Sequence, residues 1–371
     1  MNAPKIRFND FNDEWVEYIL QSESDVRDGT HDSPKYVDNG YPLITSKNLT
    51  DMGTLDFSNV SYLKQEDFDK INQRSKVDIG DILFGMIGTI GKPVRIDRDD
   101  FAIKNVALIK EKGLIKNDYL IHYLHTPTIN KQFANNQDGG TQKFIALDKI
   151  RKLKIKMPSR KEQEKIVSLF NLLDKKIELQ SKKIEDLKLF KKGLSNKIFS
   201  TLDVVKEEKL GNICNITTGK LDANAMVENG QYRFYTCAKD YYYIDKYVFD
   251  TEALLISGNG AYVGYIHYYK GKFNAYQRTY VLDQFTENIQ YIKVYLDEFL
   301  SKRINSEKKE GNTPYIVLST LSDMMIKLTN PKDEKKVINT FNNIKNKIDK
   351  EELKLNKLIE LKKGLMQNMF V

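Results

Sequence analysis

The sequence has few of the residues that build metal sites, disulfide frameworks or membrane spans. Its 371 residues include two cysteines, Cys214 and Cys237, which permit at most one disulfide and exclude a zinc site made only of cysteines. The four histidines show no metal-ligand spacing, and His122 and His125 are expected to pack rather than to bind a ligand. No apolar run reaches the roughly 18 residues of a membrane span, and residues 1–20 lack a secretory signal. We therefore expect a cytoplasmic protein with no metal and no membrane partner.

Motifs that carry catalytic chemistry are missing as well. Two glycine-bearing stretches, GDILFGMIGTIGK (80–92) and EALLISGNGAYVGY (252–265), miss the spacings of a phosphate-binding and a dinucleotide-binding loop by one residue each. Their glycines are instead predicted to form strand-to-strand turns that need positive φ. The sequence also has no Asn/Asp-Pro-Pro-aromatic tetrapeptide, no HExxH and no GxSxG motif. A binding scaffold fits this chain better than an enzyme.

What the sequence does contain is a long heptad pattern over residues 161–199. Apolar residues recur there at alternating steps of four and three, which is the seam of a coiled coil. A helix of about 39 residues is roughly 58 Å long, which is longer than a small domain is wide. The predicted seam consists of Ile166, Phe170, Leu173, Ile177, Gln180, Ile184, Leu187, Leu194 and Ile198, with Lys191 as a second polar exception.

The same pattern recurs 171 residues later, over residues 332–370. Its seam consists of Val337, Phe341, Ile344, Ile348, Glu351, Leu355, Leu358, Leu365 and Met369, with Lys362 in the place of Lys191. The words LFKKGLSNKIF and ELKKGLMQNMF end the two copies. These matches indicate an internal duplication. We expect the two helices to pair antiparallel, with Gln180 and Glu351 near the centre.

Two sheet-rich globular regions alternate with these helices. We predict an α+β protein with a pseudo-two-fold duplication, made of a first domain (1–157), a first helix (158–200), a second domain (201–329) and a second helix (330–371). Strands are expected at YPLIT, VSYL, GDILFGMIG, PVRI and VALIK, then at YRFYT, KYVF, ALLIS, YVGYIHYY and TYVL. Helices are expected at 117–124 and 289–303. The proposed matches between the domains are 80–92 with 252–265, 101–109 with 273–282, and EWVEYI (14–19) with EKLGNI (208–213).

The charge balance suits a polyanionic partner. The net charge is +8 and the pI is about 9.0. The segment from Lys149 to Lys197 contains sixteen basic residues and six acidic ones. The alternative is that these lysines only keep the helix surfaces solvated.

The duplicated architecture, together with the words TSKNL, GDILFGMIGTIGK, GNGAYVGY and AYQRTYVL and the two helix endings, resembles the specificity subunit of type I restriction–modification enzymes. The resemblance covers essentially the whole chain. It implies two target recognition domains that each read half of a bipartite double-stranded DNA site. It also implies two helices that set the spacer and dock two modification subunits. S-adenosylmethionine, ATP and Mg are then expected on modification and restriction subunits, with no cofactor on this chain.

Polar loop residues are the candidates for DNA contact, because groove readers are polar and lysine or arginine side chains bind phosphates. For each, the alternative is ordinary turn chemistry. In the first domain the candidates are Thr30, His31, Ser46, Lys47, Asn48, Thr89, Gln142 and Lys143. In the second domain the proposed equivalents are Thr218, Lys220, Lys239, Asn259, Tyr276, Gln277, Arg278, Asn312 and Thr313.

Two other functions compete with DNA recognition. A nuclease or methyltransferase fused to one recognition domain would need about 150–200 more residues for its catalytic domain than the chain has left over. A coiled-coil adaptor that binds only proteins would need no specific DNA contact, so a sequence-specific footprint would exclude it.

Overall fold

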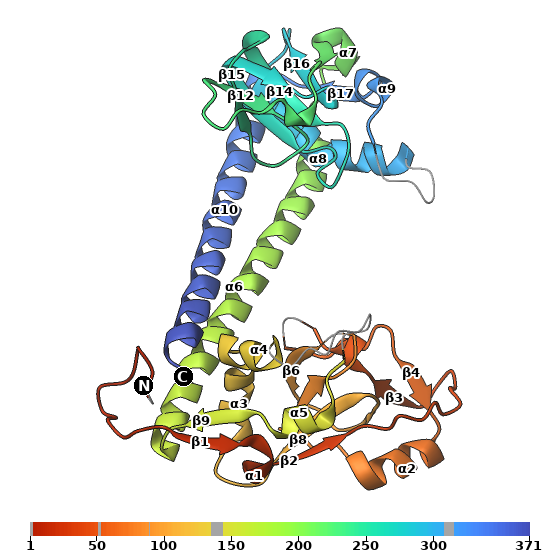
Figure 1. Cartoon of the computed structure of the whole chain (residues 1–371). Coiled ribbons are helices and arrows are strands. Elements are labelled where there is room, and N and C mark those ends of the chain that lie inside the picture. The colour runs from red at the N-terminus through yellow and green to blue at the C-terminus, as the bar shows by residue number, and fades with distance from the viewer. Residues whose placement is uncertain (1–2, 51–52, 89, 135–143, 308–314) are drawn as a thin grey trace. The chain divides into compact units, whose positions relative to one another are not determined.

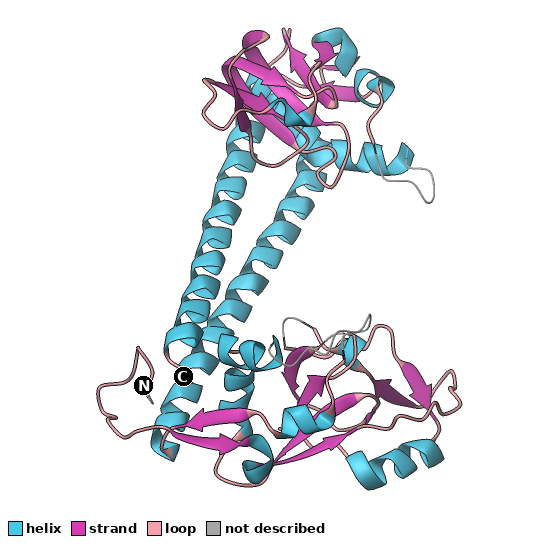
Figure 2. Cartoon of the chain, viewed as in Figure 1, coloured by secondary structure: helices cyan, strands magenta, loops and turns pink. Residues whose placement is uncertain are grey.

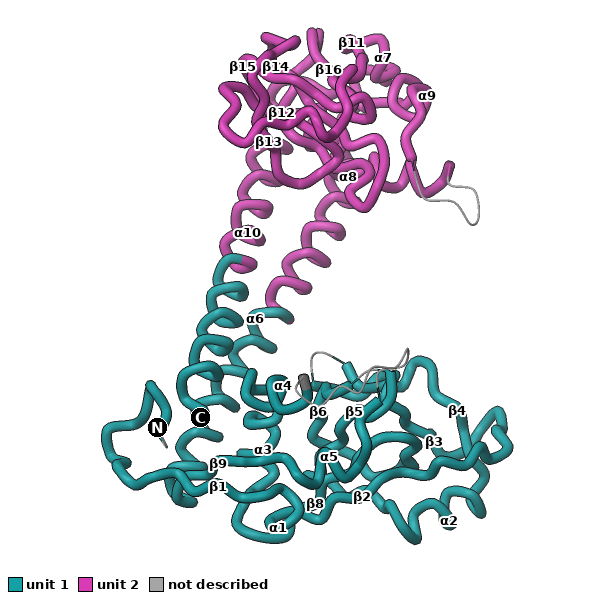
Figure 3. Tube along the Cα trace, viewed as in Figure 1, with its two compact units in different colours: residues 1–181, 353–371 teal, residues 182–352 magenta. Residues whose placement is uncertain are grey.

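The computed structural model describes residues 3–50, 53–88, 90–134, 144–307 and 315–371 (Figure 1). They form two compact units, coloured separately in Figure 3. Unit 1 contains residues 1–181 and 353–371, and unit 2 contains residues 182–352. Both are mixed helix and sheet (Figure 2), as expected from the sequence. Each unit includes part of the two long helices, α6 (Arg160–Thr201) and α10 (Pro331–Asn368).

Unit 1 is built on three small sheets. The largest is antiparallel, in the order β2-β8-β5-β6, and a second has the order β4-β3-β7 with a parallel β3–β7 pair. Strands β1 and β9 form the third. The strands are β1 (Val16–Ile19), β2 (Ser24–Asp28), β3 (Tyr41–Ile44), β4 (Ser61–Leu63), β5 (Ile82–Gly85), β6 (Gly91–Arg95), β7 (Ala102–Ile103), β8 (Val106–Glu111) and β9 (Lys154–Met157). The helices are α1 (Leu20–Glu23), η1 (Ser46–Asn48), α2 (Gln65–Ser75), α3 (Asn117–Leu124), α4 (Pro127–Ala134) and α5 (Leu147–Arg151).

Unit 2 joins the corresponding strands into one six-stranded sheet, in the order β11-β16-β14-β15-β12-β13, and pairs β10 with β17. Its strands are β10 (Lys206–Lys209), β11 (Asn215–Thr218), β12 (Tyr232–Tyr235), β13 (Tyr242–Ile244), β14 (Phe249–Ser257), β15 (Ile266–Ala275), β16 (Thr279–Asp283) and β17 (Met325–Leu328). Its helices are α7 (Leu210–Ile213), η2 (Ala223–Ala225), α8 (Ile289–Glu307) and α9 (Leu318–Ser322).

The strand registers confirm the matches between the sheet segments of the repeat. The parallel pair Leu43–Ala102 of β3 and β7 recurs as Phe234–Asn274 of β12 and β15. The turns after β5 and β14 also match. Gly88 and Gly91 have φ of 71° and 84°, and Gly260 and Gly264 have φ of 81° and 82°. The predicted positive-φ turns are therefore present in both units, because only glycine adopts that backbone without a steric cost.

The two long helices run antiparallel within each unit. In unit 1 the ring of Phe170 on α6 lies 5.5 Å from that of Phe370, which follows α10. In unit 2 the ring of Phe341 on α10 lies 5.8 Å from that of Phe199 on α6. Adding 171 to 170 and 199 gives 341 and 370, so the two aromatic contacts are equivalent in the repeat. The part that α6 plays in one contact is played by the α10 segment in the other. This exchange is the pseudo-two-fold relation expected from the sequence.

Every position of the predicted seam is buried or partly buried in the structure, including the polar ones. Glu351 is 5% exposed and accepts a hydrogen bond of 3.0 Å from Lys183 Nζ. Helix α10 begins at Pro331, whose missing N–H costs nothing in the first turn, and Asn330 Oδ1 caps the N–H of Asp333 at 3.0 Å. In the described residues no helix is long and apolar enough to span a membrane.

Some expected elements differ from the observed ones. KYVF (246–249) is mostly loop, with only Phe249 in a strand, and Tyr262–Tyr265 belong to the turn before β15. The segment DVRDGTHDSP (25–34) is rich in turn-forming residues, yet its first four residues, 25–28, lie in β2. The match of EWVEYI with EKLGNI is shifted by four residues. Val16 pairs with Met157, and Lys206 pairs with the equivalent Leu328, so Val16 corresponds to Lys206 rather than to Leu210.

Candidate nucleic-acid interface

Three loop segments of unit 1 meet at the ends of β2, β3 and β7, and we call them the unit 1 loop cluster (29–31, 45–48 and 104–105). Lys104 N–H donates to the carbonyl of Ile44 at 2.9 Å, and Asn105 N–H donates to that of Thr30 at 3.2 Å. Ser46 Oγ donates to the Asn105 carbonyl at 3.1 Å and accepts from the N–H of Met86 at 3.3 Å. These bonds tie the loops to the turn between β5 and β6.

Unit 2 repeats this arrangement in the unit 2 loop cluster (219–222, 236–239 and 276–278). Tyr276 N–H donates to the carbonyl of Tyr235 at 2.9 Å, and Gln277 N–H donates to that of Leu221 at 2.9 Å. Cys237 takes the place of Ser46, and its Sγ donates to the Arg278 carbonyl at 3.3 Å. The backbone contacts are thus shared by the two clusters, while the side chains differ.

One glycine in each cluster permits this close approach of the chains. A Cβ on Gly29 would lie 2.4 Å from the carbonyl oxygen of Ile103, and one on Gly219 would lie 1.9 Å from that of Ala275. Neither distance is possible for a real side chain, and neither glycine has positive φ, so the need for glycine is purely steric. The sequence alone does not reveal it, because the clash involves a segment more than 50 residues away.

A side-chain pair crosses each cluster at an equivalent place. In unit 1, His31 Nδ1 lies 2.7 Å from Asn105 Oδ1, and Nε2 lies 2.8 Å from Asp28 Oδ2. In unit 2, Gln277 Nε2 donates to Asp222 Oδ1 at 2.7 Å. Hydrogen bonds to Asn105 and then to Asp28 raise the pKa of His31 above its ordinary value.

Asp28, Asn105 and Asp222 are absent from the sequence-predicted set, although they belong to these pairs. Aligned on the shared glycine, DGTHD (28–32) and TGKLD (218–222) both end in an aspartate, and this match would have drawn attention to Asp222. The hydrogen bonds of the two clusters also correct two equivalences, because they imply one extra residue after Gly219. Leu221 occupies the place of Thr30 and Asp222 that of His31, whereas Thr218 ends β11 and corresponds to Asp28.

The predicted residues of unit 1 divide into exposed and buried ones. His31 and Lys47 are exposed and Thr30 is partly exposed. Ser46 and Asn48 are only 4% and 6% exposed. The Asn48 amide donates to the carbonyls of Asp56 and Asn59 at 3.0 and 3.3 Å, which favours turn chemistry over DNA contact. Thr89, Gln142 and Lys143 lie outside the described residues.

In unit 2 most predicted residues lie on the surface. Thr218, Lys220, Lys239, Gln277 and Arg278 are exposed, while Asn259 and Tyr276 are partly buried. Lys239 Nζ lies 5.3 Å from the ring centroid of the exposed Tyr262, at the turn between β14 and β15. Asn312 and Thr313 lie outside the described residues.

The exposed cations of the clusters are available to an anion. Within the described part of the chain, Lys47, Lys220 and Arg278 form no ion pair. By contrast, Arg74 is paired with Asp28 beside the unit 1 cluster. Arginine and lysine held by a rigid sheet next to exposed amides are the chemistry that DNA phosphates and base edges require. Of the two histidines expected to pack, neither belongs to the unit 1 loop cluster, and His125 is exposed, so the expectation fails for it. His122 is buried, with its ring 5.2 Å from that of Phe170.

Comparison with known proteins identifies the family. The family model described as type I restriction modification DNA specificity domain matches the chain twice, over residues 30–189 and 203–361. A curated relative, the type I restriction enzyme EcoDI specificity subunit of Escherichia coli, is 32% identical over 44% of this chain and 36% of its own length. The putative MjaX specificity subunit of Methanocaldococcus jannaschii is 29% identical over 43% of this chain and 39% of its own. The matches thus span little more than a third of these relatives.

The fold is also similar to solved structures over nearly its full length. The S subunit of a type I restriction–modification system from M. genitalium covers 100% of this chain and 99% of its own, with a TM-score of 0.67 and 17% identity. A structure described in terms of complex assembly and conformational transition of the type I R-M system covers 95% of this chain and 96% of its own, with a TM-score of 0.58 and 14% identity. Since the family model matches both halves of the repeat, this chain belongs to the family of type I restriction–modification DNA specificity domains.

Proposed function

We propose that this chain is the non-catalytic DNA-recognition subunit of a type I restriction–modification complex. Each loop cluster reads one half of a bipartite double-stranded target. The observation that supports this most is the pair of clusters itself, which share their backbone hydrogen bonds and differ in their exposed side chains. A common scaffold with variable polar side chains is what two readers of different half-sites require.

The residues available to read bases differ between the units. The unit 1 cluster presents His31 and Asn105, and the unit 2 cluster presents Gln277 and Arg278. An arginine pairs best with guanine and an amide with adenine in the major groove. The two half-sites are therefore different sequences. A protein-only adaptor would have no use for this divergence at otherwise equivalent positions.

The remaining parts of the chain have supporting roles in this proposal. Residues 1–157 and 201–329 are the two target recognition domains. Residues 158–200 and 330–371 form the spacer helices, which set the distance between half-sites and dock two modification subunits. S-adenosylmethionine, ATP and Mg act on the modification and restriction subunits, in the cytoplasm.

Exchange of one domain tests the proposal. Residues 201–329 are replaced by the corresponding domain of a relative with a known target, and methylated sites are mapped in cells that also express the modification subunit. We expect one half-site to change while the other half-site and the spacer stay the same, because the clusters belong to separate compact units. A simultaneous change of both half-sites would contradict the two-reader proposal.

A further inference from the structure

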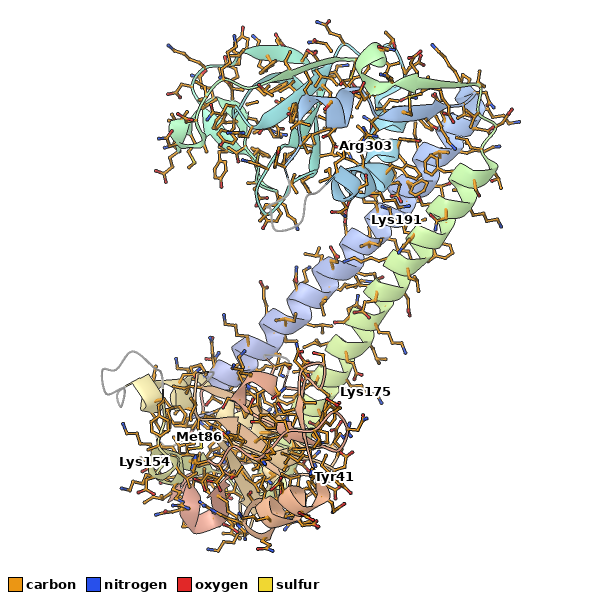
Figure 4. All side chains as sticks on the ribbon, turned by 90° about the vertical axis from the view of Figure 1, so that its right-hand side faces the viewer. Tyr41, Met86, Lys154, Lys175, Lys191 and Arg303 are labelled. Carbon is orange, nitrogen blue, oxygen red and sulfur yellow. The ribbon has the colours of Figure 1, made fainter. Side chains whose placement is uncertain are left out.

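Unit 2 has a polar hollow of about 220 Å³ between α6 and α8. Lysines dominate its lining, and Lys191, labelled in Figure 4, is one of them. The lining residues are Lys188, Lys191, Lys192, Ser195 and Asn196 of α6, with Glu298 and Lys302 of α8. This hollow lies on the long helix and its neighbour rather than among the loops of the cluster.

Unit 1 has a hollow at the equivalent place, of about 370 Å³. Adding 171 to the five α6 positions of the unit 2 hollow gives the five α10 positions that line this one: Ile359, Lys362, Lys363, Met366 and Gln367. His125 of the connection between α3 and α4, with Pro127 and Asn130 of α4, completes the wall. The duplication therefore copied a surface feature as well as the fold.

At two positions related by the repeat, each hollow has one paired and one unpaired lysine. The unit 2 hollow has two further lysines, Lys188, which pairs with Glu352, and Lys302. Lys191 forms an ion pair with Glu298, and Lys362 Nζ lies 2.5 Å from Asp174 Oδ1. Lys192 and Lys363 are exposed and form no ion pair with any described residue of the chain. One turn further along, the exposed amides of Asn196 and Gln367 stand at equivalent positions. The shared chemistry is thus one free ammonium group next to one amide donor.

This shared chemistry differs from that of the loop clusters, whose side chains diverge between the units. A contact that both units make with the same chemistry cannot depend on which half-site each unit reads. Phosphate contacts have this property, because they position a protein on DNA without reading its sequence, and lysine, asparagine and glutamine are among the side chains that make them.

We propose that each hollow binds a phosphate group of the target duplex, through Lys192 and Asn196 in unit 2 and through Lys363 and Gln367 in unit 1. The inference rests on the proposed function and adds a sequence-independent anchor to it. A carboxylate of a modification subunit would meet the same donors, and the experiment below separates the two ligands.

The test compares two double variants of the chain assembled with its modification subunits. Lys192→Gln with Lys363→Gln removes the unpaired lysine that the repeat places in both hollows. Lys176→Gln with Lys347→Gln is the matched control, since these exposed lysines are also related by the repeat. They lie 16 residues earlier on the same helices, roughly 160° around the helix axis. Both variants therefore have the same net charge. DNA affinity is measured from 50 to 200 mM salt on a duplex with the target and on a scrambled duplex, and assembly is measured by size-exclusion chromatography.

We expect the hollow variant to bind both duplexes more weakly by the same factor. Its salt slope should fall by about one unit per lysine, so that affinity declines roughly 12-fold less over this salt range. The methylated sequence should not change. Behaviour equal to that of the control would overturn the inference. So would loss of the modification subunits with an unchanged affinity of the chain for DNA. If the unaltered complex shows no preference for any target, the proposed function fails as well, which is a distinguishable result.

Discussion

Replacing Gly219 with alanine would place a methyl group inside the unit 2 loop cluster. The new Cβ would lie 1.9 Å from the carbonyl oxygen of Ala275 and 2.6 Å from that of Tyr276. Both neighbours are backbone atoms, so neither can rotate away. The end of β11 must therefore move away from the segment 275–278 to make room for the methyl group.

The loss of folding free energy can be estimated from the overpacking and from the hydrogen bonds that this separation breaks. Overpacking costs about 1–3 kcal/mol. The bonds from Gly219 N–H to the Thr279 carbonyl (3.2 Å) and from Gln277 N–H to the Leu221 carbonyl (2.9 Å) contribute about 1 kcal/mol each. We therefore expect Gly219→Ala to lower the free energy of unfolding of unit 2 by about 3–5 kcal/mol.

The assay is urea unfolding combined with amide hydrogen exchange. Protection should fall for residues 215–222 and 276–283, while the protection of unit 1 stays the same. Binding should weaken at one half-site only. The mirrored variant Gly29→Ala should reverse this pattern, since its Cβ would lie 2.4 Å from the Ile103 carbonyl oxygen.

Gly193→Ala and Gly364→Ala serve as controls, because a Cβ at either helical position meets nothing within 4 Å. Each should stabilise the protein by up to about 1 kcal/mol, the difference in helix propensity. If Gly219→Ala unfolds at the same urea concentration as Gly193→Ala, the steric argument for the cluster is refuted.

Two further predictions concern the helix contacts and His31. Phe170→Ala and Phe341→Ala should each lower the free energy of unfolding by about 3–5 kcal/mol, in unit 1 and unit 2 respectively. The ring of Phe170 is buried against Phe370, which follows α10, and that of Phe341 against Phe199 of α6. Hydrogen exchange should show the loss in one unit at a time, and equal losses in both units for either variant would contradict the assignment. The pKa of His31 is raised by Asn105 and Asp28, against the lowering effect of Arg74. The protonated ring therefore stabilises the unit 1 cluster fully below about pH 6.5, and this contribution is lost as pH rises through the raised pKa. DNA affinity at the unit 1 half-site should fall between pH 6 and 8.5, and a His31→Gln variant should lose this slope. An unchanged slope in His31→Gln would assign the pH dependence to another group.

The duplication made the large features predictable from the sequence. Heptad spacing gives the helices, and a fixed offset of 171 residues gives their pairing, because both signals extend over many residues. Helix α3 was predicted at its observed bounds, and most strands were found from their β-branched and aromatic runs.

Features that depend on distant segments could not be found in this way. Helix α2 was missed because its apolar side consists of little more than Phe68 and Ile71, and its stability comes from packing on β3 and β7, where Phe68 stacks on Tyr41. The sequence KYVF has strand propensity, but in the fold it forms a loop whose Tyr247 packs on Tyr232. Among the site residues, Ser46 and Asn48 looked like surface polar groups, and only the fold shows that loop carbonyls use their hydrogen bonds.

The division into units has a consequence for synthesis on the ribosome. Unit 2 is one continuous segment, 182–352, whereas unit 1 needs residues 353–371 to complete its core. The ring of Phe370 lies 6.5 Å from that of Trp15, and 5.7 Å from those of Tyr119 and Tyr123. These contacts form only after residue 370 leaves the exit tunnel. The usual order, in which the part translated first also folds first, is reversed here. Unit 1, whose larger part is translated first, stays incomplete, with exposed aromatic residues, until residues 353–371 have emerged.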